Sequence, residues 1–342
     1  MHICLVRFSS MGDVVLQTAT VNWLRSLLGK NLVLTFVTSK EFQSLVEGHP
    51  EINHVVGFDR RKEKWSEFMK RLSAHDEEHP FDLILDLHAT MRSFRLKLSF
   101  WGVAQLTVDK RRWERFFLTK FKSKFFGRLW KGEPQVERII RDLQDLFGDP
   151  RALTATRDYR RGKHEELTNL AELPVYPIPG KYIVVAPSAS FHPKRWPVER
   201  FLELSKRIIA ETSYHVVVLA GPDDTFCEIF NGVDERLMNL QGKTSLKESM
   251  QILARAELSI GNDSGMNHIA EAYEVPVVTI FGPTDPRFGF VPHGKKSSFL
   301  SKDLWCKPCS TTGKSRCYRK EQYCMTMITV DDVLARAKEA LI

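Results

Sequence analysis

Residues 259–286 read SIGNDSGMNHIAEAYEVPVVTIFGPTDP, and this stretch decides the fold class. It opens on the end of an apolar strand, passes through a polar turn at 261–265, continues as a helix over 266–273 and returns as a strand over 277–281. A β-turn-α-β unit of this kind is the building block of a parallel sheet. The sequence therefore predicts an α/β protein.

The turn at 261–265 predicts a ligand site. A helix N-terminus offers free backbone N–H groups to a phosphate or diphosphate, and glycine lets the backbone approach such a ligand closely. Asp263 is different, because a carboxylate repels phosphate, and it suits the hydroxyls of a sugar or ribose beside the phosphate. The other interpretation is that Asn262, Asp263 or Ser264 simply caps the helix.

The length and composition limit the number of domains, the cellular location and the class of partner that we expect. A chain of 342 residues suggests two domains. Arg7 breaks the apolar start at 3–6 and no run of about 18 apolar residues follows, so we expect neither a signal peptide nor a membrane span. A cytoplasmic enzyme is then the default, with its six cysteines reduced, metal-bound or reactive. The net charge of +8 favours an anionic partner: nucleic acid, a phosphorylated small molecule or an acidic membrane surface.

Strands and helices alternate in both halves of the chain. In the first half we expect strands over 3–8, 32–37, 54–58 and 81–87, with helices over 14–28, 40–47, 65–72, 135–147 and 163–170. After a proline-rich linker at 173–180, the second half has strands over 182–186 and 215–219 and helices over 198–210 and 245–256. We predict two doubly wound, Rossmann-like parallel-sheet domains, 1–173 and 174–328, and a C-terminal helix over 329–342.

Polar turns follow the strands at four places. Ligands of parallel α/β sheets bind beyond the carboxyl ends of the strands, and the turns at that position are 9–13, 188–194, 221–224 and 262–265. Two such domains facing a cleft describe the GT-B architecture of glycosyltransferases, and also sugar-nucleotide epimerases and phosphorylases. A carboxylate at Asp13 could take a proton from an attacking hydroxyl, as an inverting transferase needs. A helix cap after Gly12 is the alternative.

Residues 91–131 are strongly basic and rich in aromatics. They hold twelve Lys or Arg residues against two acids. One interpretation is a solvated helix face over the core. The one we favour is a docking surface for anionic lipid or a phosphorylated sugar, with contacts from Arg92, Arg95, Lys110, Arg111 and Arg112. Nucleic acid would suit the same composition.

The motifs together resemble glycosyltransferase family 9, the bacterial lipopolysaccharide heptosyltransferases. The residues that carry this are RFSSMGDVV at 7–15, KRWP at 194–197, NDSGMNH at 262–268 and FGPTDP at 281–286. The resemblance covers nearly the whole chain. It implies a GT-B fold, an ADP-heptose donor bound mainly by the second domain, and an inner-core saccharide on lipid A, or another surface glycan, as acceptor.

The resemblance also assigns residues. Asp13 matches the family's catalytic base, and Lys194 matches the lysine that contacts the donor phosphates and sugar. Asp263 matches the acid that holds heptose hydroxyls, and Asp223 falls where the family often has an acid, commonly Glu, for the adenosine ribose. The remaining substrate-binding set comprises Ser10, Met11, Gly12, Ser188, Ser190, Ser264, Gly265, Met266 and His268. We expect no catalytic metal, because Lys194 and the helix dipole could stabilise the leaving diphosphate.

Four cysteines lie within nineteen residues: Cys306, Cys309, Cys317 and Cys324. Four thiols at this density support a tetrahedral structural site for zinc or iron, and relatives hold a similar cluster. Such a site would pin the tail of the chain and take no part in transfer. Four reduced thiols in an ordered loop are the alternative.

The sequence thus predicts an inverting heptosyltransferase at the inner face of the cytoplasmic membrane, with no nucleic-acid partner. One alternative is a family relative that uses another nucleotide sugar or a protein acceptor. An alternative from a different class is a non-enzymatic binder of nucleic acid or acidic glycan acting through residues 91–131. The polar strand-end turns argue against it, because a binder has no need of Asp13 facing a diphosphate site.

Overall fold

The computed structural model describes residues 1–109, 112–121, 137, 139–141, 143, 167 and 175–342. Most of the helices expected over 135–147 and 163–170 lies outside these residues, as do Lys110 and Arg111. The described chain falls into two compact units. The first contains residues 1–109, and the second contains residues 175–342 together with helix α5 (Arg112–Phe121).

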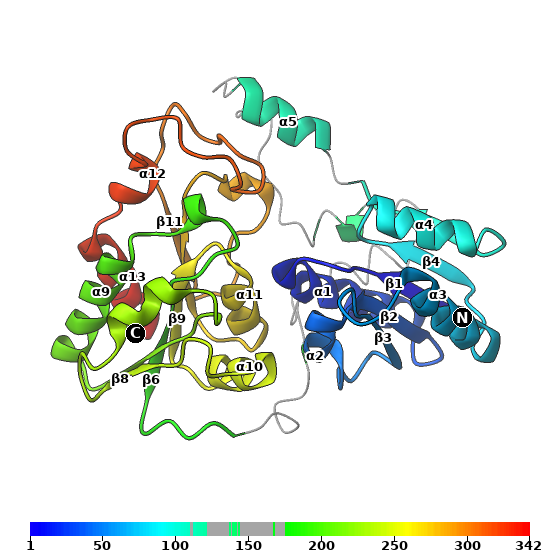
Figure 1. Ribbon diagram of the computed structural model, residues 1–342, viewed down its shortest axis with the longest axis horizontal. Helices are drawn as coiled ribbons and strands as arrows, with labels where there is room; N and C mark the ends of the chain where they lie inside the picture. The colour runs from blue at the N-terminus through cyan, green and yellow to red at the C-terminus, as the bar shows by residue number, and fades with distance from the viewer. Residues whose placement is uncertain (110–111, 122–136, 138, 142, 144–166, 168–174) are drawn as a thin grey trace. The chain divides into compact units, whose positions relative to one another are not determined.

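The first unit is built on a five-stranded parallel sheet in the order β3-β2-β1-β4-β5. Its strands are β1 His2–Val6, β2 Val33–Ser39, β3 His54–Phe58, β4 Leu83–Asp86 and β5 Ala104–Thr107. Its helices are α1 Met11–Leu28, the short α2 Gln43–Val46, α3 Trp65–Glu78 and α4 Met91–Ser99 (Figure 1). The predicted doubly wound parallel sheet is confirmed for this half of the chain.

Helices cover both faces of this sheet, which explains why every residue of β1 is buried. Cys4 and Val6 of β1 pack in one core cluster with Phe68 of α3 and Leu96 of α4. Ile3 and Leu5 alternate with them along the strand and face the other side, and both are fully buried. Continuous apolar strands are the expected signature of a sheet covered on both faces.

The second unit has a six-stranded parallel sheet in the order β11-β10-β9-β6-β7-β8. Its strands are β6 Tyr182–Ala186, β7 His215–Val218, β8 Leu237–Asn239, β9 Leu258–Asn262, β10 Val277–Phe281 and β11 Ser298–Ser301. Its main helices are α9 Val198–Glu211, α10 Leu246–Ala254, α11 Gly265–Ala272 and α13 Val330–Leu341, with a short α12 Tyr323–Thr326. The second predicted parallel sheet is therefore also confirmed.

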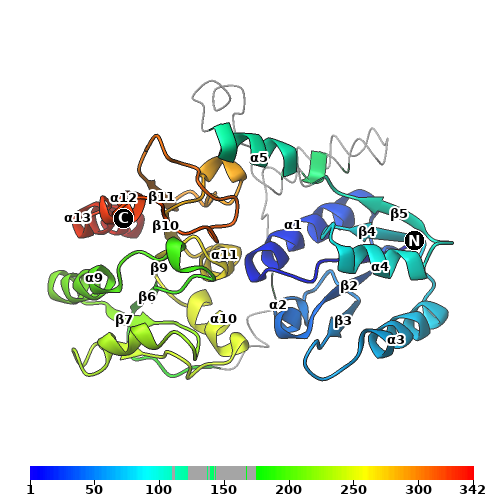
Figure 2. The ribbon, with the colours of Figure 1, turned by 45° about the horizontal axis from the view of Figure 1, so that its top comes forward.

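Two helices of the second unit share one core. Phe201 of α9 and Leu334 of α13 belong to the same buried cluster as Val185 of β6 and Ile260 of β9. Figure 2 shows α9 and α13 along one side of this sheet, with α10 and α11 along the other. The C-terminal helix expected over 329–342 is thus part of the core of this unit.

Helix α5 lies inside the range expected for the first domain, but its contacts are with the second unit. The Nη2 of Arg115 donates to the backbone oxygen of Phe288 at 3.4 Å, and the same guanidinium lies 5.7 Å from the ring centroid of Phe290. The basic stretch 91–131 is therefore divided between the two units.

Three edge strands were absent from the sequence-based prediction: β5, β8 and β11. Each is only three or four residues long, and β5 is largely exposed. Short polar edge strands lack the apolar run that reveals a buried one. Among the described residues no helix has the length and apolar character needed to cross a bilayer.

Candidate active site

Asp13 lies in the first turn of α1, directly beyond the carboxyl end of β1. Its Oδ2 accepts hydrogen bonds from Ser10, at 3.2 Å from the backbone N–H and 2.8 Å from the hydroxyl. Its Oδ1 pairs with Nη2 of Arg7 at 2.5 Å, and the side chains of Arg7 and Asp13 are 6% and 17% exposed. Burial alone would raise the pKa of Asp13, but the Arg7 guanidinium and the bonds from Ser10 lower it well below its usual value. The carboxylate is therefore ionised across the physiological range.

A second turn, after β4, supports this loop, because β4 pairs with β1 and Val6 lies opposite Asp86. The Nδ1 of His88 accepts the backbone N–H of Phe8 at 3.0 Å, and a guanidinium nitrogen of Arg7 donates to the backbone oxygen of Leu87. Asp86, almost fully buried, accepts the backbone N–H of His88 at 2.9 Å. Sequence reasoning missed these supports, although His88 follows a buried strand as a polar residue in the same way as Asp13 does.

Lys194 and Asp263 meet in the second unit. They come from the turns after β6 and β9, which are neighbouring strands, and Lys194 Nζ lies 2.8 Å from Asp263 Oδ2. The same oxygen accepts the hydroxyl of Thr284, which follows β10, at 3.0 Å. Three adjacent strand ends therefore supply one cluster, and two of its members, Lys194 and Asp263, were predicted as site residues.

Two buried asparagines hold the turns of this cluster in place. The Nδ2 of Asn262 donates to the backbone oxygen of Pro187 at 2.6 Å, and its Oδ1 accepts the backbone N–H of Trp196 at 2.9 Å. Asn267 donates to the hydroxyl of Thr279 at 2.9 Å. Asn262 thus connects the turn after β9 to both ends of the turn that carries Lys194, which explains an asparagine before Asp263.

Ser264 is the N-cap residue of α11, the helix predicted to receive phosphate. Its hydroxyl oxygen is buried and has no hydrogen-bond partner within the described chain. Gly265 and Met266 follow in the first turn and are half-buried. A helix N-terminus with an unpaired hydroxyl beside a lysine is a suitable environment for an anion.

The turn after β7 carries two adjacent acids, Asp224 and the predicted ribose contact Asp223, and they have different environments. The hydroxyl of Ser188 donates to Oδ2 of Asp224 at 2.6 Å, and Arg195 pairs with its Oδ1 at 3.1 Å. Asp223 is exposed in the same turn and makes no hydrogen bond or ion pair with other described residues. Asp224 therefore organises the loop, whereas Asp223 faces solvent, where a ligand can reach it.

The remaining predicted residues line the same turns. Met11 and Gly12 open α1 beside Asp13, with Gly12 buried, and Ser190 is exposed in the turn that carries Lys194. His268 lies on α11, half-buried, with its ring 6.2 Å from that of Phe290, and it lines a small hollow together with Asp263. These placements bring His268 near the cluster without bonding it to Lys194.

The four cysteines line one hollow beside the turn after β6. Burial raises the pKa of the Cys324 thiol, and burial likewise lowers the pKa of Lys307, which faces the sulfurs. Four thiols that line one hollow, with a lysine next to them, supply donor atoms of the kind that zinc and iron take. Metal binding would displace the thiol protons.

The cysteine-rich loop also contacts the turn that carries Lys194. A Cβ added at Gly313, whose φ is +84°, would lie 2.3 Å from Cγ of Lys194, and Gln322 donates to the backbone oxygen of Pro193. The loop therefore packs directly against the aliphatic part of Lys194, a contact that no sequence pattern predicted.

The basic stretch exposes apolar side chains along α4 and just beyond it. Met91, Phe94, Leu98 and Trp101 follow a helical spacing and are 75%, 50%, 59% and 87% exposed. The guanidinium of Arg95 lies 5.6 Å from the ring of Trp65 on α3.

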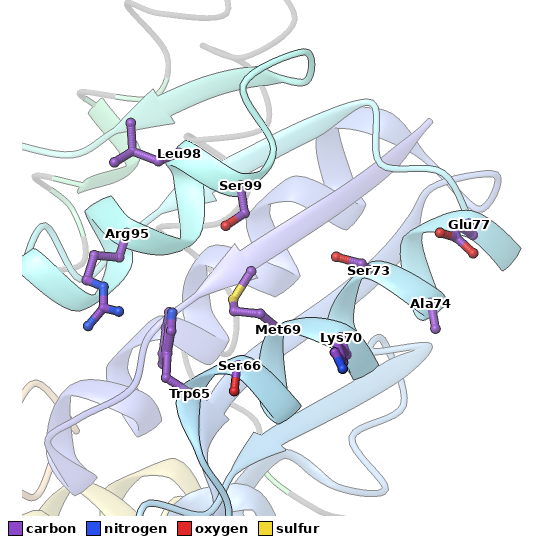
Figure 3. Close-up of a pocket in the computed structure, with 10 residues that line it drawn as sticks. All are labelled: Trp65, Ser66, Met69, Lys70, Ser73, Ala74, Glu77, Arg95, Leu98 and Ser99. Carbon is purple, nitrogen blue, oxygen red and sulfur yellow. The ribbon is translucent and has the colours of Figure 1, made fainter.

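A surface hollow of about 620 Å³ separates α4 from α3, and Figure 3 shows its lining. Arg92 lies over the ring of Phe8, at 5.4 Å from its centroid. Arg112 begins α5, but its side chain lies outside the described residues, as do Lys110 and Arg111.

Known proteins resemble the chain over most of its length. The family described as glycosyltransferase family 9 (heptosyltransferase) matches residues 69–318. Lipopolysaccharide heptosyltransferase 1 of Pseudomonas aeruginosa is 24% identical over 325 residues, which cover 90% of this chain and 86% of that protein.

Solved structures agree with this match. A family 9 glycosyltransferase from Veillonella parvula superposes with a TM-score of 0.74 at 18% identity, over 99% of this chain and 97% of that one. The E. coli heptosyltransferase WaaC with ADP-2-deoxy-2-fluoro heptose gives a TM-score of 0.66 at 18% identity, over 99% of both chains.

Two doubly wound units with polar strand-end turns thus define an enzyme of the GT-B fold that transfers a glycosyl group. The chain belongs to glycosyltransferase family 9. The resemblance found in the sequence motifs is confirmed, and with it the GT-B fold.

Proposed function

We propose that this enzyme transfers heptose from ADP-heptose to an inner-core saccharide of lipopolysaccharide, or to a related surface glycan, with inversion at the anomeric carbon. Membership of family 9 and the similarity to lipopolysaccharide heptosyltransferase 1 support the sugar and the acceptor class. The heptose analogue bound to the E. coli relative supports an ADP-linked donor.

The observation that carries the proposal is the cluster of Lys194, Asp263 and Ser264 at the N-terminus of α11. A diphosphate here would receive the Lys194 ammonium, backbone N–H groups of the helix and the unpaired Ser264 hydroxyl. Asp263, already held by Thr284, would accept hydroxyls of the heptose. The cluster therefore offers donors for the phosphates and an acceptor for the sugar.

Asp13 would act as the general base. In the proposed step the acceptor oxygen attacks the anomeric carbon, and its proton passes to the Asp13 carboxylate. The bond between the anomeric carbon and the diphosphate oxygen breaks, and ADP leaves with the electron pair. Lys194 would stabilise the negative charge that develops on the leaving diphosphate.

The acceptor would reach the enzyme at a membrane surface through α4. The exposed stripe of Met91, Phe94, Leu98 and Trp101 lies beside Arg92 and Arg95, a combination suited to anionic headgroups and the acyl boundary. Pelleting with vesicles of anionic phospholipid should fall at least tenfold for Leu98→Glu/Trp101→Glu. Equal pelleting of this variant and the wild type would contradict the assignment of α4.

The cysteine-rich loop would hold a structural zinc or iron ion through Cys306, Cys309, Cys317 and Cys324. Elemental analysis should find about one equivalent more metal in the purified full chain than in Cys309→Ser/Cys317→Ser. Absence of metal from protein purified without chelator would mean that the four thiols remain reduced.

The donor is tested by a thermal-shift panel with ADP, UDP, GDP and ADP-heptose. A ligand at one hundred times its dissociation constant stabilises the native state by about 2.7 kcal/mol. Stabilisation by ADP and ADP-heptose alone is the expected result. Stabilisation by UDP or GDP instead would mean that the donor is a different nucleotide sugar. If no nucleotide shifts the melting temperature, the result would favour the alternative function, a non-enzymatic binder acting through residues 91–131.

A further inference from the structure

Three histidines outside the candidate active site bring their ring nitrogens together. His54 opens β3, His75 lies in the last turn of α3, and His79 ends that helix one turn later. One ring nitrogen from each lies within 4.8 Å of the others. The ring centroids are 4.9 Å apart for His54 and His75, and 4.8 Å apart for His54 and His79.

The cluster lies at the amino ends of the strands of the first sheet. His54 is the first residue of β3 and lies opposite Thr35, near the start of β2. Asp13 follows the carboxyl end of β1, so the parallel strands separate it from the histidines. In such sheets the chemistry takes place beyond the carboxyl ends. A function of the histidine cluster is therefore independent of the proposed transfer site.

A hydrogen-bond network through Thr35 and His2 holds the ring of His75 at its Nε2 side. Its Nε2 lies 3.0 Å from the hydroxyl of Thr35, and that hydroxyl lies 2.8 Å from Nε2 of His2. Histidines that bind metals through one ring nitrogen usually donate the N–H on the other to a neighbouring acceptor. In the tautomer with the proton on Nε2 of His75, Thr35 is that acceptor, and Nδ1 of His75 is left for a ligand.

Two of the three imidazoles, those of His54 and His75, are also favoured in the neutral state that binds metals. Burial lowers the pKa of His54 and of His75, and repulsion from the neighbouring histidines lowers both further, against a smaller opposing effect of Glu78 on His75. Neutral imidazole has the lone pair that a metal ion needs.

We propose that His54, His75 and His79 form a binding site for a divalent transition-metal ion of the zinc class. A tetrahedral ion with bonds of about 2.0–2.1 Å to nitrogen needs nitrogens about 3.4 Å apart. His79 is exposed and can rotate to close the difference. Three imidazoles leave the fourth position to water, and the ion would clamp the end of α3 to the start of β3.

The test uses the full chain without an affinity tag, stripped with EDTA and titrated with Co²⁺ and Zn²⁺. All proteins carry Cys309→Ser/Cys317→Ser, so that the cysteine-rich loop does not compete. His79→Gln and His54→Gln should each weaken Zn²⁺ binding at least tenfold. Thr35→Val should weaken it by up to about tenfold through the lost support of His75. The matched control is His215→Gln, at the start of β7, which should bind as the parent does.

The readouts are the visible absorption of bound Co²⁺ and the rise in melting temperature with Zn²⁺. Tetrahedral cobalt bands in the parent that disappear in His79→Gln would support the site. The proposal is overturned if the parent binds no ion, or if His54→Gln, His79→Gln and His215→Gln bind equally. Packed rings alone would give the first result, and equal binding would mean that the ion is held at another site.

Discussion

The two units present opposite versions of one device, a buried ion pair at a strand end. In the first unit Arg7 and Asp13 come from a single loop, and the acid is the group proposed to react. In the second unit Lys194 and Asp263 come from turns 69 residues apart, and the cation is the group proposed to stabilise the leaving diphosphate. Arg7 keeps the Asp13 carboxyl charged, and Asp263 holds the Lys194 side chain in position. Replacing Asp13 should therefore affect proton transfer, whereas replacing Lys194 should affect both the leaving group and nucleotide binding.

The largest effect is expected from Asp13→Asn. Losing the proton acceptor should lower kcat by about 10²- to 10⁴-fold, because general-base catalysis contributes that much. ADP binding to the second unit should be unchanged, which a thermal shift with ADP checks. The control is Asp331→Asn, an exposed acid in the first turn of α13. Normal turnover by Asp13→Asn would show that Asp13 is not the general base.

The pH dependence sharpens this prediction. The folded-state pKa of Asp13 lies below the ordinary value of about 3.9, so the carboxylate contributes stability above that pH and loses it as pH falls through the folded pKa. The stability difference between wild type and Asp13→Asn should shrink in acid, which urea unfolding at a series of pH values measures. For the same reason kcat/KM should show no acid limb from this group above about pH 4.

Lys194→Met is expected to have the second-largest effect. Removing a charge that stabilises the leaving group should lower kcat by about 10²- to 10³-fold, and it should also weaken ADP binding, which Asp13→Asn should not. Lys302→Met is the matched control, because Lys302 follows the edge strand β11 and pairs at 2.9 Å with Asp332 of α13. Steady-state kinetics and ADP titration distinguish the two. Unchanged kcat in Lys194→Met would exclude the leaving-group role.

Gly313→Ala tests whether the cysteine-rich loop positions Lys194. The added Cβ would lie 2.3 Å from Cγ of Lys194, so the lysine must move, and kcat should fall about tenfold. Gly232→Ala is the matched control, because Gly232 has a φ of +68° against +84° for Gly313 and nothing within 4 Å of its added Cβ. Both variants should lose about 1 kcal/mol of stability, but only Gly313→Ala should lose activity. Equal kcat in the two variants would mean that the contact between Gly313 and Lys194 does not position the lysine for catalysis.

The sequence predicted the elements more successfully than the contacts between them. Apolar strands covered on both faces, such as β1 and β9, stand out as continuous runs. The polar turns after the strands, read together with the family resemblance, led to the predictions for Asp13, Lys194 and Asp263. The pairing of Lys194 with Asp263 was not predictable, because it depends on β6 and β9 being neighbours, which no local pattern shows.

The positions within a turn were equally hard to predict. Asp223 and Asp224 are adjacent in the sequence, and only the bonds from Ser188 and Arg195 reveal that Asp224 is the structural one. The three histidines lie up to 25 residues apart, from His54 to His79, on a strand and a helix, so no motif announced them.

The smallest effect is expected from Ser264→Ala, a variant that should change ADP affinity without changing the stability of the free enzyme. The Ser264 hydroxyl is buried without a partner in the described chain, so its removal should leave the melting temperature of the free enzyme unchanged. If the hydroxyl donates to the diphosphate, ADP affinity should fall about 2- to 10-fold, the range of one hydrogen bond. Ser188→Ala gives the contrast, because that hydroxyl already bonds Asp224 at 2.6 Å and its loss should cost about 1 kcal/mol of stability. Calorimetric titration with ADP and thermal unfolding measure both quantities. Unchanged affinity in Ser264→Ala would place the diphosphate away from the N-terminus of α11 and leave Lys194 as the main anion contact.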